Sequence, residues 1–324
     1  MLNLFLRGRG NSFFILPLII LVFLMKSIIN PALIIDSPSF LFSKIDAFLY
    51  EYKYLKLFFG FILITSIAFY IKTVYNNHDY YQTENTLSSL FFVILVGAWS
   101  GFHFFSPMYL TLLFILLGLN QILYVYHQKV IISEVFNAGF FLGLAALIYY
   151  PAALFIISFW LFISINRAFN FREYLFLVIG LSLPFFFLSV YFFYNDLPYD
   201  FIYLTRGDEV SSLISVASIT QRLFLVLSGV AIIVALPFFI KQISRAKVKS
   251  KNNRRMILLL LLNSMLIYYL SFIIFPVHNR ELLLVIPMVF IIPSYFYNVS
   301  SLFRNILFYF WLVAALLFDF VPIM

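Results

Sequence analysis

The chain has 324 residues, of which 64% are hydrophobic, 21% aromatic and only 10% charged, and it contains no cysteine. A water-soluble domain could not bury that much apolar surface, and zero cysteines exclude disulfides, thiolate metal ligands and cysteine nucleophiles. The formal net charge of +8 does not indicate a nucleic-acid partner, because the cations are scattered through short connections between apolar runs.

Apolar runs bounded by charge, Pro or Asn predict about eleven membrane-spanning helices in a single all-α domain, residues 1–324. In chain order, we expect spans near residues 13–29, 57–75, 87–104, 108–126, 134–150, 152–167, 173–194, 222–240, 256–275, 281–298 and 305–322. The first run follows Arg7 and Arg9, is long for a signal-peptide core and lacks a small-residue cleavage site, so we interpret it as a retained helix. The chain is thus predicted to be a polytopic integral membrane protein.

The orientation depends on Tyr149-Tyr150-Pro151, which either kinks one helix or separates two short helices. With two helices, the basic connection at about 241–255 falls on the same side as Arg7, Arg167 and most other cations, as expected for cytoplasmic segments. A single kinked helix would place that connection outside. We therefore expect two helices, a cytoplasmic N-terminus, an outer C-terminus and a location in the bacterial inner membrane.

Two connections on the predicted outer side are long, at about residues 30–56 and 195–221. Both are too apolar and aromatic for solvated linkers, so we expect them to lie on the membrane surface. They could cap a cavity on that side.

Small and polar residues inside the predicted spans indicate close helix packing. Gly139 and Gly143 are four residues apart and give one helix face on which a second helix can approach closely. Asn120 and Asn263 must find partners in hydrocarbon, and we expect interhelical hydrogen bonds in preference to a polar cavity.

Candidate functional residues concentrate on the outer side. His278, Arg280 and Glu281 share one turn before the apolar run 282–287. Arg is suited to bidentate contact with phosphate oxygens, and a helix N-terminus adds backbone donors for an anion. This turn is therefore a candidate site for a lipid-linked phosphate, although a short connection between two helices also needs polar residues where it meets water.

Asp36 and Asp46 lie in the first long outer connection and are the candidate catalytic carboxylates. Either could act as a general base or as a ligand of a divalent metal ion, although the sequence requires no metal. His103, in a predicted outer turn, is a further candidate for substrate binding, with an ordinary surface histidine as the alternative.

Two resemblances extend this interpretation. The stretches FYIKTVYNNHDYYQTENTLSSLFFVIL (69–95) and, within 136–184, NAGFFLGLAALIYYP and FNFREYLFLVIGLSLP resemble an uncharacterised family of multi-pass membrane proteins from Bacteroidota-type bacteria. The acids of the first outer connection, the Gly-rich run 139–151 and HNRELLLVIP (278–287) resemble the glycosyltransferase superfamily C (GT-C). That second resemblance implies a polyprenyl-phosphate-sugar transferase with its site on the outer face, in which His278 and Arg280 hold the lipid phosphate.

The sequence thus favours a GT-C-like glycosyltransferase that uses lipid-linked sugars in cell-envelope glycan synthesis. A non-enzymatic scaffold or assembly subunit with membrane-protein partners is the alternative, and a transporter is the third hypothesis. The sequence has no phosphate-binding glycine loop, paired-histidine metal helix or nucleophile elbow, so nucleotide or protease chemistry of the soluble type is unsupported.

Overall fold

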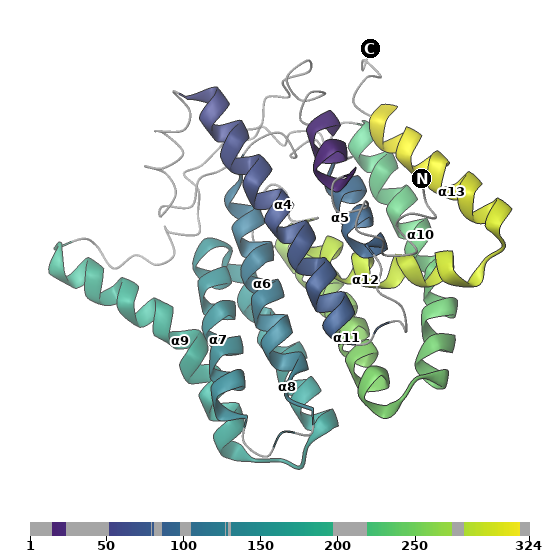
Figure 1. The fold of residues 1–324 in the computed structure, drawn as a ribbon. Helices are drawn as coiled ribbons and strands as arrows, with labels where there is room; N and C mark the ends of the chain where they lie inside the picture. Colours follow the sequence, from purple (N-terminus) through teal and green to yellow (C-terminus); the bar gives the residue numbers. More distant parts are fainter. Residues whose placement is uncertain are drawn as a thin grey trace.

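The computed structural model describes residues 15–23, 52–78, 80, 86–97, 105–126, 128, 131–196, 219–273 and 282–317. These residues are helical apart from short connections and contain no strand (Figure 1), which confirms the all-α part of the predicted fold class. After a short helix at 15–23, the elements are α4 (Lys53–Asn77), α5 (Leu87–Gly97), α6 (Pro107–Leu123), α7 (Ile132–Ile148), η2 (Tyr150–Leu154), α8 (Phe155–Asn166), α9 (Phe171–Tyr194), α10 (Ile219–Arg245), α11 (Val248–Ile273), α12 (Leu282–Asn298) and α13 (Ser301–Leu317).

Three of the described helices are long and apolar enough to cross a membrane. These segments are Tyr54–Asn77 in α4, Phe171–Tyr194 in α9 and Val226–Arg245 in α10. The other apolar helices of the described segments are shorter, at 10–17 residues. A bilayer core is about 30 Å thick and needs about 20 apolar helical residues, so helix length and apolar composition together support three crossings.

Local sequence signals set several helix starts. Ser106 caps α6, because its Oγ accepts a hydrogen bond from the Met108 amide at 3.3 Å, and Pro107 occupies the first helical position. Asn170 caps α9 in the same way through the Arg172 amide, with Glu173 in the first turn. These caps supply partners for amides that a helix leaves unsatisfied.

The chain reverses direction between α7 and α8. Tyr149 is extended, and Pro151 lies in the first turn of η2, where the amide hydrogen that proline lacks is not needed. At the far end of α8, Arg167 Nη1 donates a hydrogen bond of 2.8 Å to the carbonyl oxygen of Gln128, just before α7 begins. The end of α8 therefore lies beside the start of α7, which confirms the expectation of two helices at this point.

Helices α7 and α9 approach each other through glycine. A Cβ atom added to Gly139 would overlap the Leu177 carbonyl oxygen, and one added to Gly180 would overlap the Phe136 carbonyl oxygen. A Cβ atom added to Gly143 would likewise overlap the Leu181 carbonyl oxygen. The predicted close packing on Gly139 and Gly143 is thus confirmed, with Gly180 as its counterpart on α9.

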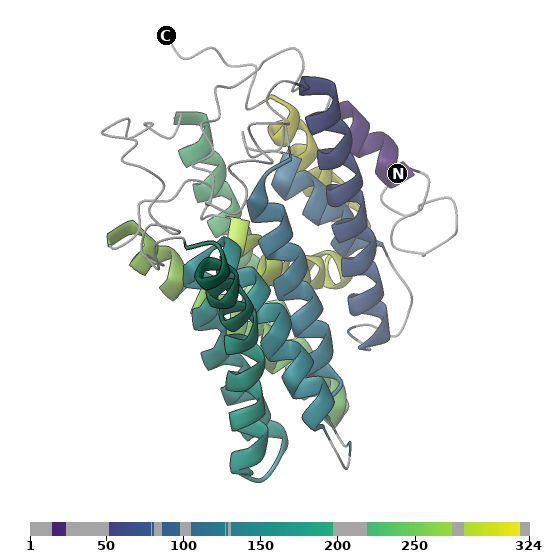
Figure 2. The same cartoon turned by 90° about the vertical axis from the view of Figure 1, so that its left-hand side faces the viewer.

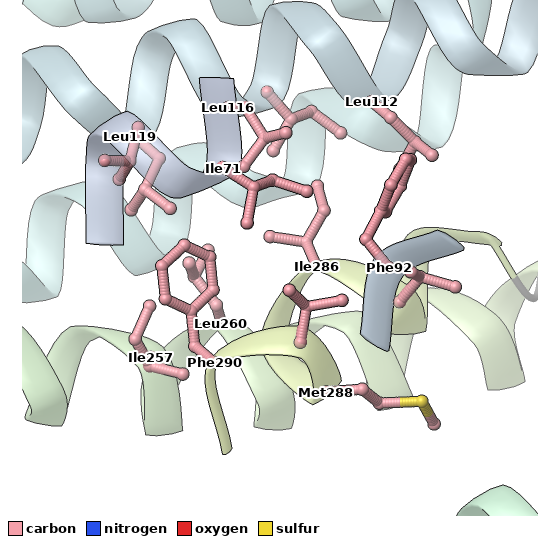
Figure 3. Close-up of a cluster of buried hydrophobic side chains, with 14 of the residues drawn as sticks. Ile71, Phe92, Leu112, Leu116, Leu119, Ile257, Leu260, Ile286, Met288 and Phe290 are labelled. Carbon is pink, nitrogen blue, oxygen red and sulfur yellow. The ribbon is translucent and has the colours of Figure 1, made fainter. Parts of the chain in front are cut away.

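Two buried helices form the centre of the molecule. All residues of α5 are buried, and so are most of those of α12, although α12 contains Pro287 and Pro293. In Figures 1 and 2, α12 runs crosswise to α4 and α6. Figure 3 shows its Ile286 and Phe290 among buried side chains of α4, α6 and α11. The predicted span at 281–298 is therefore a helix that lies across the others.

The basic connection expected at about 241–255 is almost entirely helical. Helix α10 continues to Arg245 and α11 begins at Val248, so only Ala246 and Lys247 separate them. Lys and Arg are good helix formers, and a helix therefore extends beyond its apolar segment into the charged one.

Candidate functional site

The candidate residues predicted from the sequence lie outside the described part of the chain. They are Asp36, Asp46, His103, His278, Arg280 and Glu281. Their arrangement stays a prediction, and the neighbouring described residues provide the structural information about it.

Two neighbouring features bear on that predicted site. The Phe105 amide donates a hydrogen bond of 3.3 Å to the Lys56 carbonyl oxygen, so the chain two residues after His103 contacts the first turn of α4. Helix α12, directly after Glu281, is enclosed from its first residue, with Leu282 1% exposed. Helix α12 therefore begins inside the protein interior.

No group of three or more His, Cys, Asp or Glu residues is placed to hold a metal ion within the described ranges. The described part of the chain therefore contains no such group of its own.

The main polar cluster among the described residues lies in the protein interior, and we call it the His78–Arg254 network: His78, Tyr80, Asn120, Asn253 and Arg254. Its first half joins α4 to α6. His78 follows the last residue of α4 and is fully buried, and its Nε2 lies 3.0 Å from Asn120 Oδ1. Because an amide oxygen only accepts, Nε2 is the donor. The His78 ring also makes an edge contact with Tyr124, at a centroid distance of 4.7 Å.

The second half of the network joins the segment after α4 to α11. The Tyr80 hydroxyl donates to the Asn253 carbonyl oxygen at 3.2 Å, and Asn253 Nδ2 donates to the His78 carbonyl oxygen at 3.5 Å. Burial raises the pKa of the Tyr80 hydroxyl far above its ordinary value, although the Arg254 charge acts in the opposite direction. Tyr80 therefore stays protonated and keeps donating.

Arg254 connects this network to α10. Its Nη1 donates to the Gln242 carbonyl oxygen at 2.7 Å, and its Nη2 donates to the Tyr80 carbonyl oxygen. Gln242 lies in the last turn of α10, where carbonyl groups lack helical partners and a positive charge is favourable. Gln242 Nε2 in turn donates to the Ser294 carbonyl oxygen of α12 at 3.3 Å.

The network holds five helices and the residues after α4 in fixed relative positions. Most of its hydrogen bonds run from side chains to backbone carbonyls. Such bonds hold neighbouring helices in position, because each carbonyl is itself fixed by its own chain. These hydrogen bonds connect segments that lie far apart in sequence, so the network stabilises the packing of the helices.

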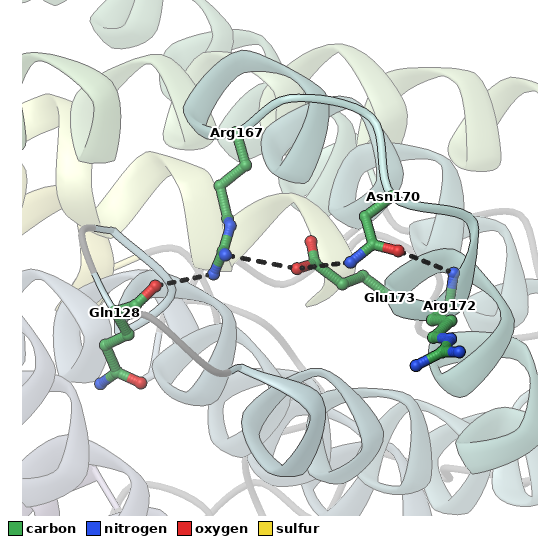
Figure 4. Close-up of polar contacts among 5 residues, drawn as sticks. All are labelled: Gln128, Arg167, Asn170, Arg172 and Glu173. Carbon is green, nitrogen blue, oxygen red and sulfur yellow. Dashed lines mark hydrogen bonds and ion pairs between the residues drawn. The ribbon is translucent and has the colours of Figure 1, made fainter.

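A second polar cluster, shown in Figure 4, joins the connection between α6 and α7 to that between α8 and α9. Arg167 Nη2 pairs with Glu173 Oε1 at 3.4 Å, and Asn170 Nδ2 donates to the same oxygen at 3.5 Å. Glu173 is buried, and its second oxygen has no hydrogen-bond partner. Together with the Arg167 bond to Gln128, the cluster fixes the end of α8 beside the start of α7.

Hydrogen bonds between helices account for the amides that the sequence singled out. Asn120 bonds to His78, and Asn263 Nδ2 donates to the Leu154 carbonyl oxygen at 2.8 Å and to Ser158 Oγ at 2.9 Å. The expectation of interhelical bonding for Asn120 and Asn263 is therefore confirmed.

Sequence reasoning placed Arg254 among the solvated cations of a cytoplasmic connection, and it gave Tyr80 no role. Both are buried, because α11 begins at Val248 and carries Arg254 inward by more than one turn. The pair Asn252-Asn253 was the available signal, since two amides within a few residues of an apolar run call for partners.

Comparison of the chain with models of protein families, with curated proteins and with solved structures finds no match. The functional argument therefore depends on the residues alone.

Proposed function

We propose that the chain is a multi-pass protein of the bacterial inner membrane, in which most of the about eleven predicted spans cross the bilayer, with a cytoplasmic N-terminus and an outer C-terminus. The three long apolar helices support this proposal. So do the α8–α9 and α10–α11 connections, which lie at the same end of the bundle (Figure 1): Arg172 is in the first turn of α9, Arg245 ends α10 and Lys247 lies between α10 and α11. Cations at one end are typical of cytoplasmic connections.

The function that we propose is transfer of a sugar from a lipid-linked phosphate donor at the outer face. The observation that carries the proposal is the burial of α12 from Leu282 onward, directly after His278, Arg280 and Glu281. The first amides of a helix have no helical partners and attract anions. Arg280 precedes this buried N-terminus in sequence, and a phosphate is the ligand that best matches an arginine together with unpaired backbone amides.

The reaction assigns a role to each candidate residue. The bond between the anomeric carbon and the phosphate oxygen breaks, and the acceptor hydroxyl oxygen forms the new bond to that carbon. Asp36 or Asp46 would take the hydroxyl proton, while Arg280 and His278 would stabilise the charge on the departing lipid phosphate. The contact between Phe105 and Lys56 supports a role for His103 near the end of the first outer connection.

Replacement of Arg280 tests the proposed transferase. We expect Arg280→Ala to lower polyprenyl-phosphate binding about ten- to a hundredfold, because a charge-assisted hydrogen bond contributes about 1.5 to 3 kcal/mol. Transfer should be measured in membranes with a polyprenyl-phosphate sugar, and binding with purified protein. Arg172→Ala is the matched control, since it removes an exposed arginine from the predicted cytoplasmic side. Unchanged binding and transfer in Arg280→Ala would reject the assignment.

A scaffold or assembly subunit is the second candidate, favoured by the distal part of α9. Beyond Pro184 this helix extends away from the others (Figure 1) and exposes large apolar side chains, among them Phe186, Phe187, Phe193 and Tyr194. A scaffold should be purified with stoichiometric partner proteins in mild detergent. Recovery of the chain alone, with transferase activity, would exclude this second function.

A further inference from the structure

The segment 241–255, which we call the basic hairpin, combines the end of α10, the two residues between the helices and the start of α11. Its side chains Lys241, Arg245, Lys247, Lys249 and Arg255 are exposed. No Asp or Glu occurs between Glu209 and Glu281, so no acid within the hairpin or near it in sequence neutralises these cations.

The helix dipoles stabilise some of these cations and destabilise others. Arg245 lies in the last turn of α10, where the helix dipole favours a positive charge. Lys249 and Lys251 lie in the first turns of α11, which has no acid in its first turn and where the dipole favours a negative charge. The start of α11 is therefore unfavourable in isolation and is stabilised when an anion approaches it.

Apolar side chains are interleaved with the cations. Ile240 is 54% exposed beside Lys241, and Val248 is 63% exposed between Lys247 and Lys249. The neighbouring α8–α9 connection exposes Phe169 and Phe171, and Asn252 Nδ2 bonds to Asn166 Oδ1 at 2.9 Å, which holds the two connections together. Exposed aromatic and aliphatic groups at the depth of a row of cations are typical of a membrane interface.

We propose that the basic hairpin and the adjacent Phe169 and Phe171 form a docking surface for anionic phospholipid headgroups of the cytoplasmic leaflet. The cations bind headgroup phosphates, while Ile240, Val248 and the two phenylalanines enter the boundary of the acyl chains. Clusters of four to eight basic residues next to a membrane helix bind anionic lipids in this way. Nucleic acid fits the charge but not the interleaved aliphatic residues, so lipid is the matching partner.

Lipid binding to the purified full chain tests the surface. In an uncharged detergent, we expect phosphatidylglycerol to bind at least about tenfold more tightly than phosphatidylcholine, measured by native mass spectrometry, and salt to reduce the difference. The triple variant Arg245→Gln/Lys247→Gln/Lys249→Gln should lose most of that preference. Lys53→Gln/Lys56→Gln/Arg222→Gln is the matched control, which removes three cations at the opposite ends of α4 and α10 and should keep it.

Three outcomes would overturn the proposal: equal affinity for the two lipids, equal loss of preference in both triple variants, or an oligonucleotide or inorganic phosphate that binds the hairpin as tightly as phosphatidylglycerol. The cytoplasmic assignment rests on the membrane orientation proposed above, whereas binding in detergent does not depend on it. Labelling of Lys247→Cys from outside intact cells would therefore reject the orientation, but the lipid preference in detergent would still be tested. Failure of the proposed sugar transfer would change neither the lipid preference nor the labelling result.

Discussion

The side chains of the His78–Arg254 network stabilise the fold mainly by hydrogen bonding to backbone carbonyl groups. Arg254 donates to carbonyl oxygens of Gln242 and Tyr80, two residues far apart in sequence. Its neighbour Arg255 points to the exterior. The two arginines are adjacent on α11, but the turn of the helix from one residue to the next leaves Arg254 buried and Arg255 exposed.

Replacement of Arg254 should destabilise the protein strongly. Arg254→Ala leaves the buried Tyr80 carbonyl and the half-buried Gln242 carbonyl without this donor, and we expect the free energy of unfolding to fall by an amount on the order of 3 kcal/mol. Thermal or denaturant unfolding of the purified protein in detergent measures the change. Arg255→Ala is the control and should stay within about 0.5 kcal/mol of the wild type. Similar stability of the two variants would show that the network does not brace the helices.

At the scale of elements, the contact between α7 and α9 depends on the absence of side chains. Gly139 and Gly180 each face a backbone carbonyl of the opposite helix, whereas a Cβ atom added to Gly229 of α10 would meet nothing within 4 Å. The same residue type therefore has opposite roles in two helices.

Alanine substitution distinguishes these roles. Gly139→Ala and Gly180→Ala should each force α7 and α9 apart, with a cost of about 1 to 3 kcal/mol from overpacking. Gly229→Ala should be neutral or stabilise the protein by about 0.5 to 1 kcal/mol, because alanine favours a helix more than glycine does. Melting temperatures of the three variants, measured side by side, test this. Equal tolerance at all three positions would contradict the close approach of α7 and α9.

At the scale of the whole molecule, the proposed orientation requires that α10 crosses the membrane. Asn195 lies just after α9, and Lys247 follows α10. Both are exposed, and the chain contains no cysteine, so single cysteines can be introduced at these positions without background.

Impermeant maleimide should label Asn195→Cys in intact spheroplasts and Lys247→Cys only after the membrane is opened. The expected sidedness follows from the concentration of cations near Lys247. Labelling of both positions from the same side would show that α10 does not cross, and the outer location of the proposed site would then lose its basis.

The sequence by itself determined that the described chain is helical and approximately where its apolar helices lie, because long and almost uncharged apolar runs favour α-helix. It also indicated the reversal at Pro151 and the glycine contact, since both follow from local residue geometry. Only the tertiary structure decided that α12 lies crosswise and that Arg254 is buried. Helix direction and the partner of a buried polar group depend on packing between segments far apart in sequence, which periodicity and charge patterns do not encode.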